Sequence, residues 1–101
     1  MFLKLDTICF HIKNAPYNTV HININAISVI EKITAIHQEF YKKNKYHPEV
    51  IENNKFLPEE LPQNGAVIYL VGNVTTPLYT VTPYKKIIET VASLTTIKEI
   101  E

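Results

Sequence analysis

The stretch that decides the fold is AVIYLVG, which spans residues 66–72 and is apolar at almost every position. Apolar residues at both odd and even positions predict a strand that is buried on both faces, in the interior of a sheet. Residues 73–76 predict a turn, and residues 77–81 predict a returning strand. Pro77 is expected at the start of that strand because proline has no N–H to donate to a neighbouring strand.

A helix is expected directly after the returning strand. Thr82 is suited to its N-cap and Pro83 to its first position, where the missing N–H removes no hydrogen bond. Apolar residues then recur at the i, i+3, i+4 and i+7 spacing of one buried stripe. These residues are Tyr84, Ile87, Ile88, Val91 and Leu94, and the residues expected on the opposite side are Lys85, Lys86, Glu89 and Ser93.

The N-terminal residues predict a β-hairpin from about Leu3 to Ile24, with turn chemistry at residues 14–18. Positions 3 and 5 of the first strand share one face, whereas Ile8, Phe10 and Ile12 occupy the other. A bulge near Asp6 and Thr7 would reconcile the two phases. The second strand, from Thr19, is expected to place Val20, Ile22 and Ile24 inward and His21 and Asn23 outward.

Two interpretations are open for residues 25–40. A helix would align Ala26, Ile30, Ile33, His37 and Phe40 along one side, and the apolar periodicity favours it. A strand would place Ile27, Val29 and Ile33 on one face, with Glu31 among them.

The middle of the chain is expected to leave the sheet as a polar excursion over residues 35–65. From Tyr41 onward the residues are mostly polar and are interrupted by three prolines, with a short helical piece expected around residues 49–53. Loops of this length in compact domains are functional or mobile. We therefore expect function to concentrate here.

Composition limits the class of protein. A chain of 101 residues is expected to form one domain, residues 1–101. Ten basic and ten acidic side chains give a formal net charge of +0, so no overall field attracts the protein to nucleic acid or to anionic lipid. Cys9 is the only cysteine, which favours a reducing compartment, and no apolar run reaches the about 20 residues that cross a bilayer. A cytoplasmic location without membrane contact is expected.

One segment has the chemistry of a nucleic-acid site. Three lysines alternate with two aromatic residues, a pattern suited to phosphate neutralisation and base stacking. The residues are Tyr41, Lys42, Lys43, Lys45 and Tyr46. The same pattern is typical of a solvated helix end, and the acidic residues from Glu49 to Glu60 would repel phosphate unless the fold separates them.

No catalytic, metal or cofactor site is predicted. His11 and His21 are expected to oppose each other on the hairpin, but Zn²⁺ normally takes three or four protein ligands and nothing completes the set. Cys9 lies two residues before His11 without a recognisable oxyanion site, so a packed thiol is expected. The remaining titratable candidates are expected to be solvated: His37, His47, Glu31, Glu39, Glu59 and Glu60.

The order of the apolar segments resembles the flagellar FlbD-like family of small bacterial and phage-encoded proteins. The resemblance lies in residues 2–5, 22–30, 67–70 and 84–94. It implies a small non-enzymatic β-rich module, and it favours a strand over the first half of residues 25–40. A fainter resemblance, to LytTR DNA-binding domains, underlies the nucleic-acid alternative.

The fold class expected from these observations is α+β: an antiparallel meander of four or five strands, a C-terminal amphipathic helix and a long polar insertion. The first functional hypothesis is a non-catalytic protein-interaction module that self-associates and is of the kind that phages or mobile elements encode. The alternative is a small nucleic-acid-binding regulator. No small-molecule substrate is expected.

Overall fold

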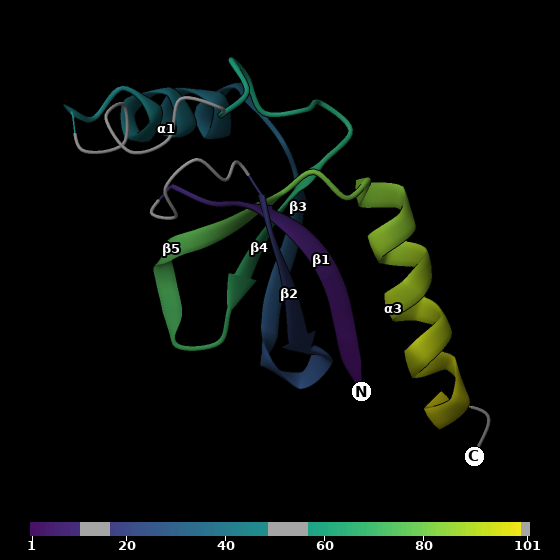
Figure 1. The fold of residues 1–101 in the computed structure, drawn as a ribbon. Coiled ribbons are helices and arrows are strands. Elements are labelled where there is room, and N and C mark those ends of the chain that lie inside the picture. Colours follow the sequence, from purple (N-terminus) through teal and green to yellow (C-terminus); the bar gives the residue numbers. More distant parts are fainter. Residues whose placement is uncertain (11–16, 49–56, 100–101) are drawn as a thin grey trace.

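The computed structural model describes residues 1–10, 17–48 and 57–99 (Figure 1). Five antiparallel strands form one sheet in the order β2-β1-β5-β4-β3, and two described helices pack against it. The elements are β1 (Phe2–Ile8), β2 (Tyr17–Asn23), the 3₁₀ turn η1 (Ile24–Ala26), β3 (Ile27–Lys32), α1 (Ala35–Lys45), β4 (Ala66–Leu70), β5 (Asn73–Thr80) and α3 (Tyr84–Glu99). The α+β class, the five-stranded antiparallel sheet and the C-terminal helix are thus confirmed. The strand order is not that of a simple meander, because β1 lies between β2 and β5.

β1 and β2 pair in continuous register from Phe2 opposite Asn23 to Ile8 opposite Tyr17. The predicted bulge near Asp6 and Thr7 is therefore wrong. The apolar phase changes because Leu3 and Leu5 face one apolar cluster, whereas Ile8, at the end of β1, faces the cluster on the other side of the sheet. The earlier residues on the side of Ile8 are exposed. β2 begins at Tyr17, two residues before the predicted start, and residues 11–16 lie outside the described part of the chain.

Residues 25–40 satisfy neither interpretation over their whole length. η1 and β3 occupy the first half, as the family resemblance favoured, and α1 begins at Ala35. The register between β3 and β4 shifts between Ile27 and Val29. The first eleven residues of the predicted polar excursion are consequently a helix, and the predicted helical piece at residues 49–53 lies outside the described residues.

A tight turn at Val71 and Gly72 joins β4 to β5. Gly72 has φ of 80°, a conformation that glycine adopts without steric penalty. The predicted turn at residues 73–76 is wrong, because these residues already belong to β5. Pro77 lies inside β5 rather than at its start, in the part where the register with β4 shifts between Ile68 and Leu70. An irregular ladder tolerates the missing N–H of proline.

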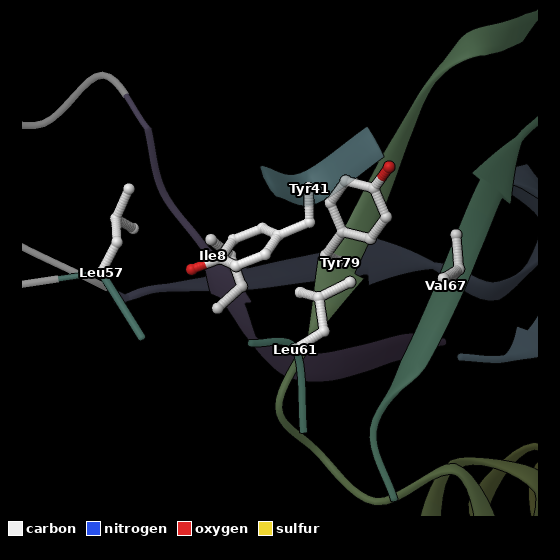
Figure 2. Close-up of a cluster of buried hydrophobic side chains, with 6 residues drawn as sticks. All are labelled: Ile8, Tyr41, Leu57, Leu61, Val67 and Tyr79. Carbon is white, nitrogen blue, oxygen red and sulfur yellow. The ribbon is translucent and has the colours of Figure 1, made fainter. Parts of the chain in front are cut away.

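β4 lies between β5 and β3, and it is buried on both faces, as predicted. Val67 contributes to one cluster, which also contains Ile8, Tyr41, Leu57, Leu61 and Tyr79 (Figure 2). Ala66 and Ile68 contribute to the cluster on the other face, with Leu3, Leu5, Ile22 and Ile87. α3 covers this second cluster, whereas α1 and the segment that follows it cover the first.

β1 meets β5 only near the end of β5. Thr7 opposite Thr80 is the pair that joins them, and the Asp6 carbonyl oxygen accepts hydrogen bonds from Val81 N–H (3.0 Å) and from Thr80 Oγ1 (2.7 Å). The Thr82 hydroxyl accepts from Asp6 N–H at 3.3 Å. The Thr82 side chain therefore bonds to β1 of the sheet, and the predicted role of Thr82 as the N-cap of the helix is wrong.

α3 begins one residue later than predicted, at Tyr84, and the Pro83 carbonyl oxygen accepts the first helical hydrogen bond, from Ile87 N–H at 3.0 Å. Tyr84, Ile87, Val91 and Leu94 are buried at least in part, as the apolar stripe predicts, but Ile88 is exposed. Among the described residues, no helix combines the length and the apolar character needed to cross a membrane.

Candidate interaction surface

The N-terminus of α1 is fixed by a capping box in which histidine replaces the usual Glu or Gln. The Nδ1 atom of His37 accepts the backbone N–H of Thr34 at 3.0 Å and lies 3.1 Å from the Thr34 hydroxyl. Because Nδ1 accepts, the ring proton of the neutral imidazole lies on Nε2, which faces Glu31 Oε2 at 3.4 Å. His37 is buried, so its predicted solvation is wrong.

The inner face of α1 is anchored by Tyr41. This residue has no exposed surface, and its ring packs 5.8 Å from the ring of Phe10 and 6.5 Å from that of Tyr79, between centroids. Its hydroxyl donates to the Pro58 carbonyl oxygen. Burial raises the pKa of the Tyr41 phenol well above its usual range. Tyr41 therefore belongs to the core, and its ring is not available for the base stacking predicted for it.

The segment that follows the helix is held against α1 by its backbone. The Gln38 side-chain amide donates to the Leu61 carbonyl oxygen at 2.7 Å and accepts from Leu61 N–H at 2.8 Å. Leu57 and Leu61 are buried beside Tyr41. These residues of the predicted excursion therefore pack as part of the core.

The lysines of the predicted nucleic-acid site face the acidic residues that the sequence left unplaced. Lys42 Nζ lies 3.6 Å from Glu60 Oε1, and Lys45 Nζ lies 3.1 Å from Glu59 Oε2. The Tyr46 hydroxyl lies 3.5 Å from the same Glu59 atom. The fold thus brings Glu59 and Glu60 to the basic cluster, which lowers the positive potential available to a phosphate. The other acidic residues, at positions 49–52, lie outside the described part of the chain.

The outer face of α1 is unusually apolar. Ile36 and Phe40 lie one helical turn apart and are 62% and 53% exposed. Lys43 follows at the next turn, with Nζ 5.9 Å from the centroid of the Phe40 ring. We refer to Ile36, Phe40 and Lys43, with the neighbouring Glu39, as the α1 outer face. The helical interpretation of residues 25–40 aligned Phe40 with His37, but in the structure His37 is buried and Phe40 is exposed.

A groove of about 610 Å³ lies between the start of α1 and the segment after it. Its lining is mostly polar, and it includes Gln38, Glu39, Lys42 and Glu60. Lys42 and Glu60 are paired with each other, and Gln38 is bonded to Leu61. The groove therefore borders the α1 outer face without gathering its charged groups around a common point.

The other candidates are dispersed over the fold. His21 lies on β2 opposite Lys4. The predicted pairing of His21 with His11 involves a residue that lies outside the described part of the chain. Cys9 is half-buried after the end of β1, and His47 is exposed beyond α1. Within residues 1–10, 17–48 and 57–99, no group of three or more potential metal ligands is found.

No family model matches the chain, and no curated protein or solved structure gives a significant match. The resemblance to the FlbD-like family therefore stays a prediction.

Proposed function

We propose that this protein is a non-catalytic protein-interaction module that self-associates through the α1 outer face. The observation that carries the proposal is the exposure of Ile36 and Phe40 on a helix whose inner face is fully packed. Large apolar side chains grouped on one exposed helix face are typical of a docking surface. The capping box at Thr34 and the hydrogen bonds between the Gln38 side chain and the Leu61 backbone hold this helix in place, which reduces the entropy lost on association.

A second copy of the same helix is the partner that this face fits best. α1 has eleven residues and is therefore about 16 Å long, with Phe40 near its middle. In an antiparallel two-fold pair, Phe40 would pack against the partner's α1 at the centre of the contact. Glu39 and Lys43 lie one turn apart, so Glu39 of each copy would lie near Lys43 of the other copy. The apolar pair and the charges are thus self-complementary.

The nucleic-acid alternative has weaker support. Two of its three lysines are already paired with carboxylates, and one of its two aromatic rings is buried. Lys43 and Tyr46 remain exposed. One unpaired lysine and one aromatic ring form a smaller surface than the basic patch that nucleic-acid-binding proteins normally use.

The first test measures mass against concentration, by light scattering or sedimentation equilibrium from about 10 µM to about 1 mM, the range of weak self-association. We expect the wild-type mass to rise toward that of a dimer and Phe40→Glu to stay monomeric with an unchanged far-ultraviolet spectrum. Val71→Glu is the matched control, because Val71 is 67% exposed but lies at the β4–β5 turn. A wild-type protein that stays monomeric throughout would contradict the proposal.

A charge exchange tests the antiparallel arrangement. Glu39→Lys should weaken association by placing like charges opposite each other, and so should Lys43→Glu. The double variant should restore association toward the wild-type level because the charges are again complementary. If the double variant is as weak as the sum of the two single variants, another geometry applies.

A further inference from the structure

The first half of β1 has a free edge. β5 pairs with β1 only at Thr7 and then ends at Thr80, and the chain continues as α3. Within the described residues, no strand pairs with residues 2–5 on the side of β1 that faces away from β2. An unpaired strand edge presents N–H and C=O groups that can accept another strand.

The direction of these backbone groups follows from Asp6. Its N–H is bonded to Thr82 Oγ1 and its carbonyl oxygen to Val81 N–H, so both point away from β2. Backbone groups alternate in direction along a strand, so those of Lys4 and Phe2 point to the same side. The groups of Leu3 and Leu5 point toward β2 and are used in the hairpin.

A groove of about 450 Å³ runs along this edge, between β1 and α3. Five consecutive residues of β1, Phe2–Asp6, line it, together with Thr82, Lys86, Ile87 and Thr90. Consecutive residues show that the groove follows the edge of the strand, because a groove on one face would be lined by alternate residues. Figure 1 shows α3 running beside β1 from the end of β5 toward the N-terminus.

The groove is apolar at its base and basic at its rim. Leu3, Leu5 and Ile87 are buried, whereas Lys4 and Lys86 are exposed. In the described part of the chain, neither lysine forms an ion pair. The one carboxylate in the lining, that of Asp6, accepts from Thr19 Oγ1 at 2.8 Å on the neighbouring strand. The rim therefore has an excess of uncompensated positive charge.

We propose that this groove binds an extended acidic peptide by β-strand addition to residues 2–5. The peptide would hydrogen-bond to the backbone of Lys4 and Phe2, place alternate apolar side chains on Leu3, Leu5 and Ile87, and present carboxylates to Lys4 and Lys86. A groove with α3 as its second wall suits a single extended peptide better than the edge of an intact second copy. The site is thus separate from the α1 outer face.

The test is a ¹⁵N NMR titration of the full-length protein with the acetylated and amidated peptide Glu-Val-Glu-Val-Glu. The Lys4 amide should shift and exchange more slowly, while the Leu3 and Leu5 amides, already bonded to β2, should change less. This alternation distinguishes strand addition from non-specific attraction. The same peptide with lysine in place of glutamate should bind more weakly, and N-methylation of all the peptide's amide groups should remove binding.

Charge variants locate the peptide. Lys86→Glu should weaken the affinity by about threefold or more, and Lys85→Glu, next to it but outside the groove lining, should leave it unchanged. Repeating the titration with Phe40→Glu separates this site from self-association, since both proteins should bind alike. The proposal is overturned if the Lys4 amide does not respond, if Lys86→Glu has no effect, or if the lysine peptide binds as well as the acidic one.

Discussion

The side chain of Gln38 forms two hydrogen bonds with the backbone of Leu61, of 2.7 Å and 2.8 Å, across 23 positions of the chain. The amide imitates a neighbouring strand: it donates to the carbonyl oxygen and accepts from the N–H of the same residue. These two hydrogen bonds help to hold the segment after α1 against the helix, where Leu57 and Leu61 pack beside Tyr41 and the Tyr41 hydroxyl donates to the Pro58 carbonyl oxygen.

Gln38→Glu keeps the size of this side chain and removes its donor. The charged carboxylate would face the Leu61 carbonyl oxygen, so we expect the free energy of unfolding to fall by about 1–3 kcal/mol. That corresponds to a melting temperature lower by at least about 4 °C in a domain of this size. Glu39→Gln, at the exposed neighbouring position, should shift the melting temperature little. Equal melting temperatures for Gln38→Glu and the wild type would mean that these hydrogen bonds contribute nothing.

Tyr41 should make the protein sensitive to alkali. Burial raises the pKa of its phenol above the ordinary value of about 10, as it also does for Tyr79. The unfolded state then loses these protons first, so the free energy of unfolding should be level below about pH 10 and should fall above it, by at most about 1.4 kcal/mol per pH unit for each tyrosine. Denaturant titrations at successive pH values measure this slope.

Tyr41→Phe provides the control for that slope. It removes the hydrogen bond to Pro58, which should lower stability by about 1 kcal/mol near neutral pH. The decline above about pH 10 should become shallower, since one of the late-titrating phenols is gone. An unchanged slope would show that folding does not raise the pKa of Tyr41.

The two glycines of the chain should respond differently to alanine. Gly72 has φ of 80° and open space around it, so Gly72→Ala should lower the free energy of unfolding only through the strain of a left-handed backbone, by about 1 kcal/mol. Gly65 is buried, and a Cβ there would collide with the Thr80 carbonyl oxygen, so Gly65→Ala should cost more, about 2 kcal/mol or above. Ser93→Ala, at an exposed site on α3, serves as the reference. Thermal melts that rank Gly72→Ala as the more damaging change would refute this assignment.

The ion pairs of α1 predict weak binding to DNA. Fluorescence anisotropy with labelled duplex and single-stranded DNA should stay flat at about 0.15 M salt, where exposed charges are screened beyond about 8 Å. Glu59→Gln combined with Glu60→Gln releases Lys42 and Lys45 and should raise the affinity at low salt. Glu89→Gln is the control, because it also removes a carboxylate but lies at an exposed position of α3, which covers the other face of the sheet.

The opposite result would revive the regulator hypothesis. Saturable wild-type binding, with a log affinity that falls by about 0.9 per neutralised phosphate for each unit of log salt, would favour it. Loss of that binding when Lys42, Lys43 and Lys45 become glutamine would assign it to α1.

The parts of the fold that the sequence predicts are those where one local pattern dominates. Residues 66–70 are apolar throughout and form the doubly buried β4, and the spacing of Tyr84, Ile87 and Val91 predicts α3. Residues 25–40 were ambiguous because they contain two elements, and the boundary at Thr34 uses a histidine where a capping box normally has Glu or Gln. The usual capping-box pattern therefore does not predict a helix start at Thr34.

The candidate surface was less predictable because it depends on contacts between distant residues. Lys42 meets Glu60 and Lys45 meets Glu59 only after the chain has folded back on α1. Tyr41 and Tyr46 look alike in the sequence, yet one is fully buried and the other is 57% exposed. The phase of α1 against the sheet decides this difference, and tertiary packing sets that phase.

The pairing of β1 with β5 affects when the sheet can form during protein synthesis. Its hydrogen bonds connect residues that are 74 to 76 positions apart in a chain of 101 residues. During synthesis the β1–β2 hairpin leaves the ribosome long before Thr80 and Thr82 do, and it must wait with one edge open. We therefore expect the nascent chain to acquire its native sheet only near the end of translation, and ribosome-bound fragments that stop before Thr80 to be the form most in need of a chaperone.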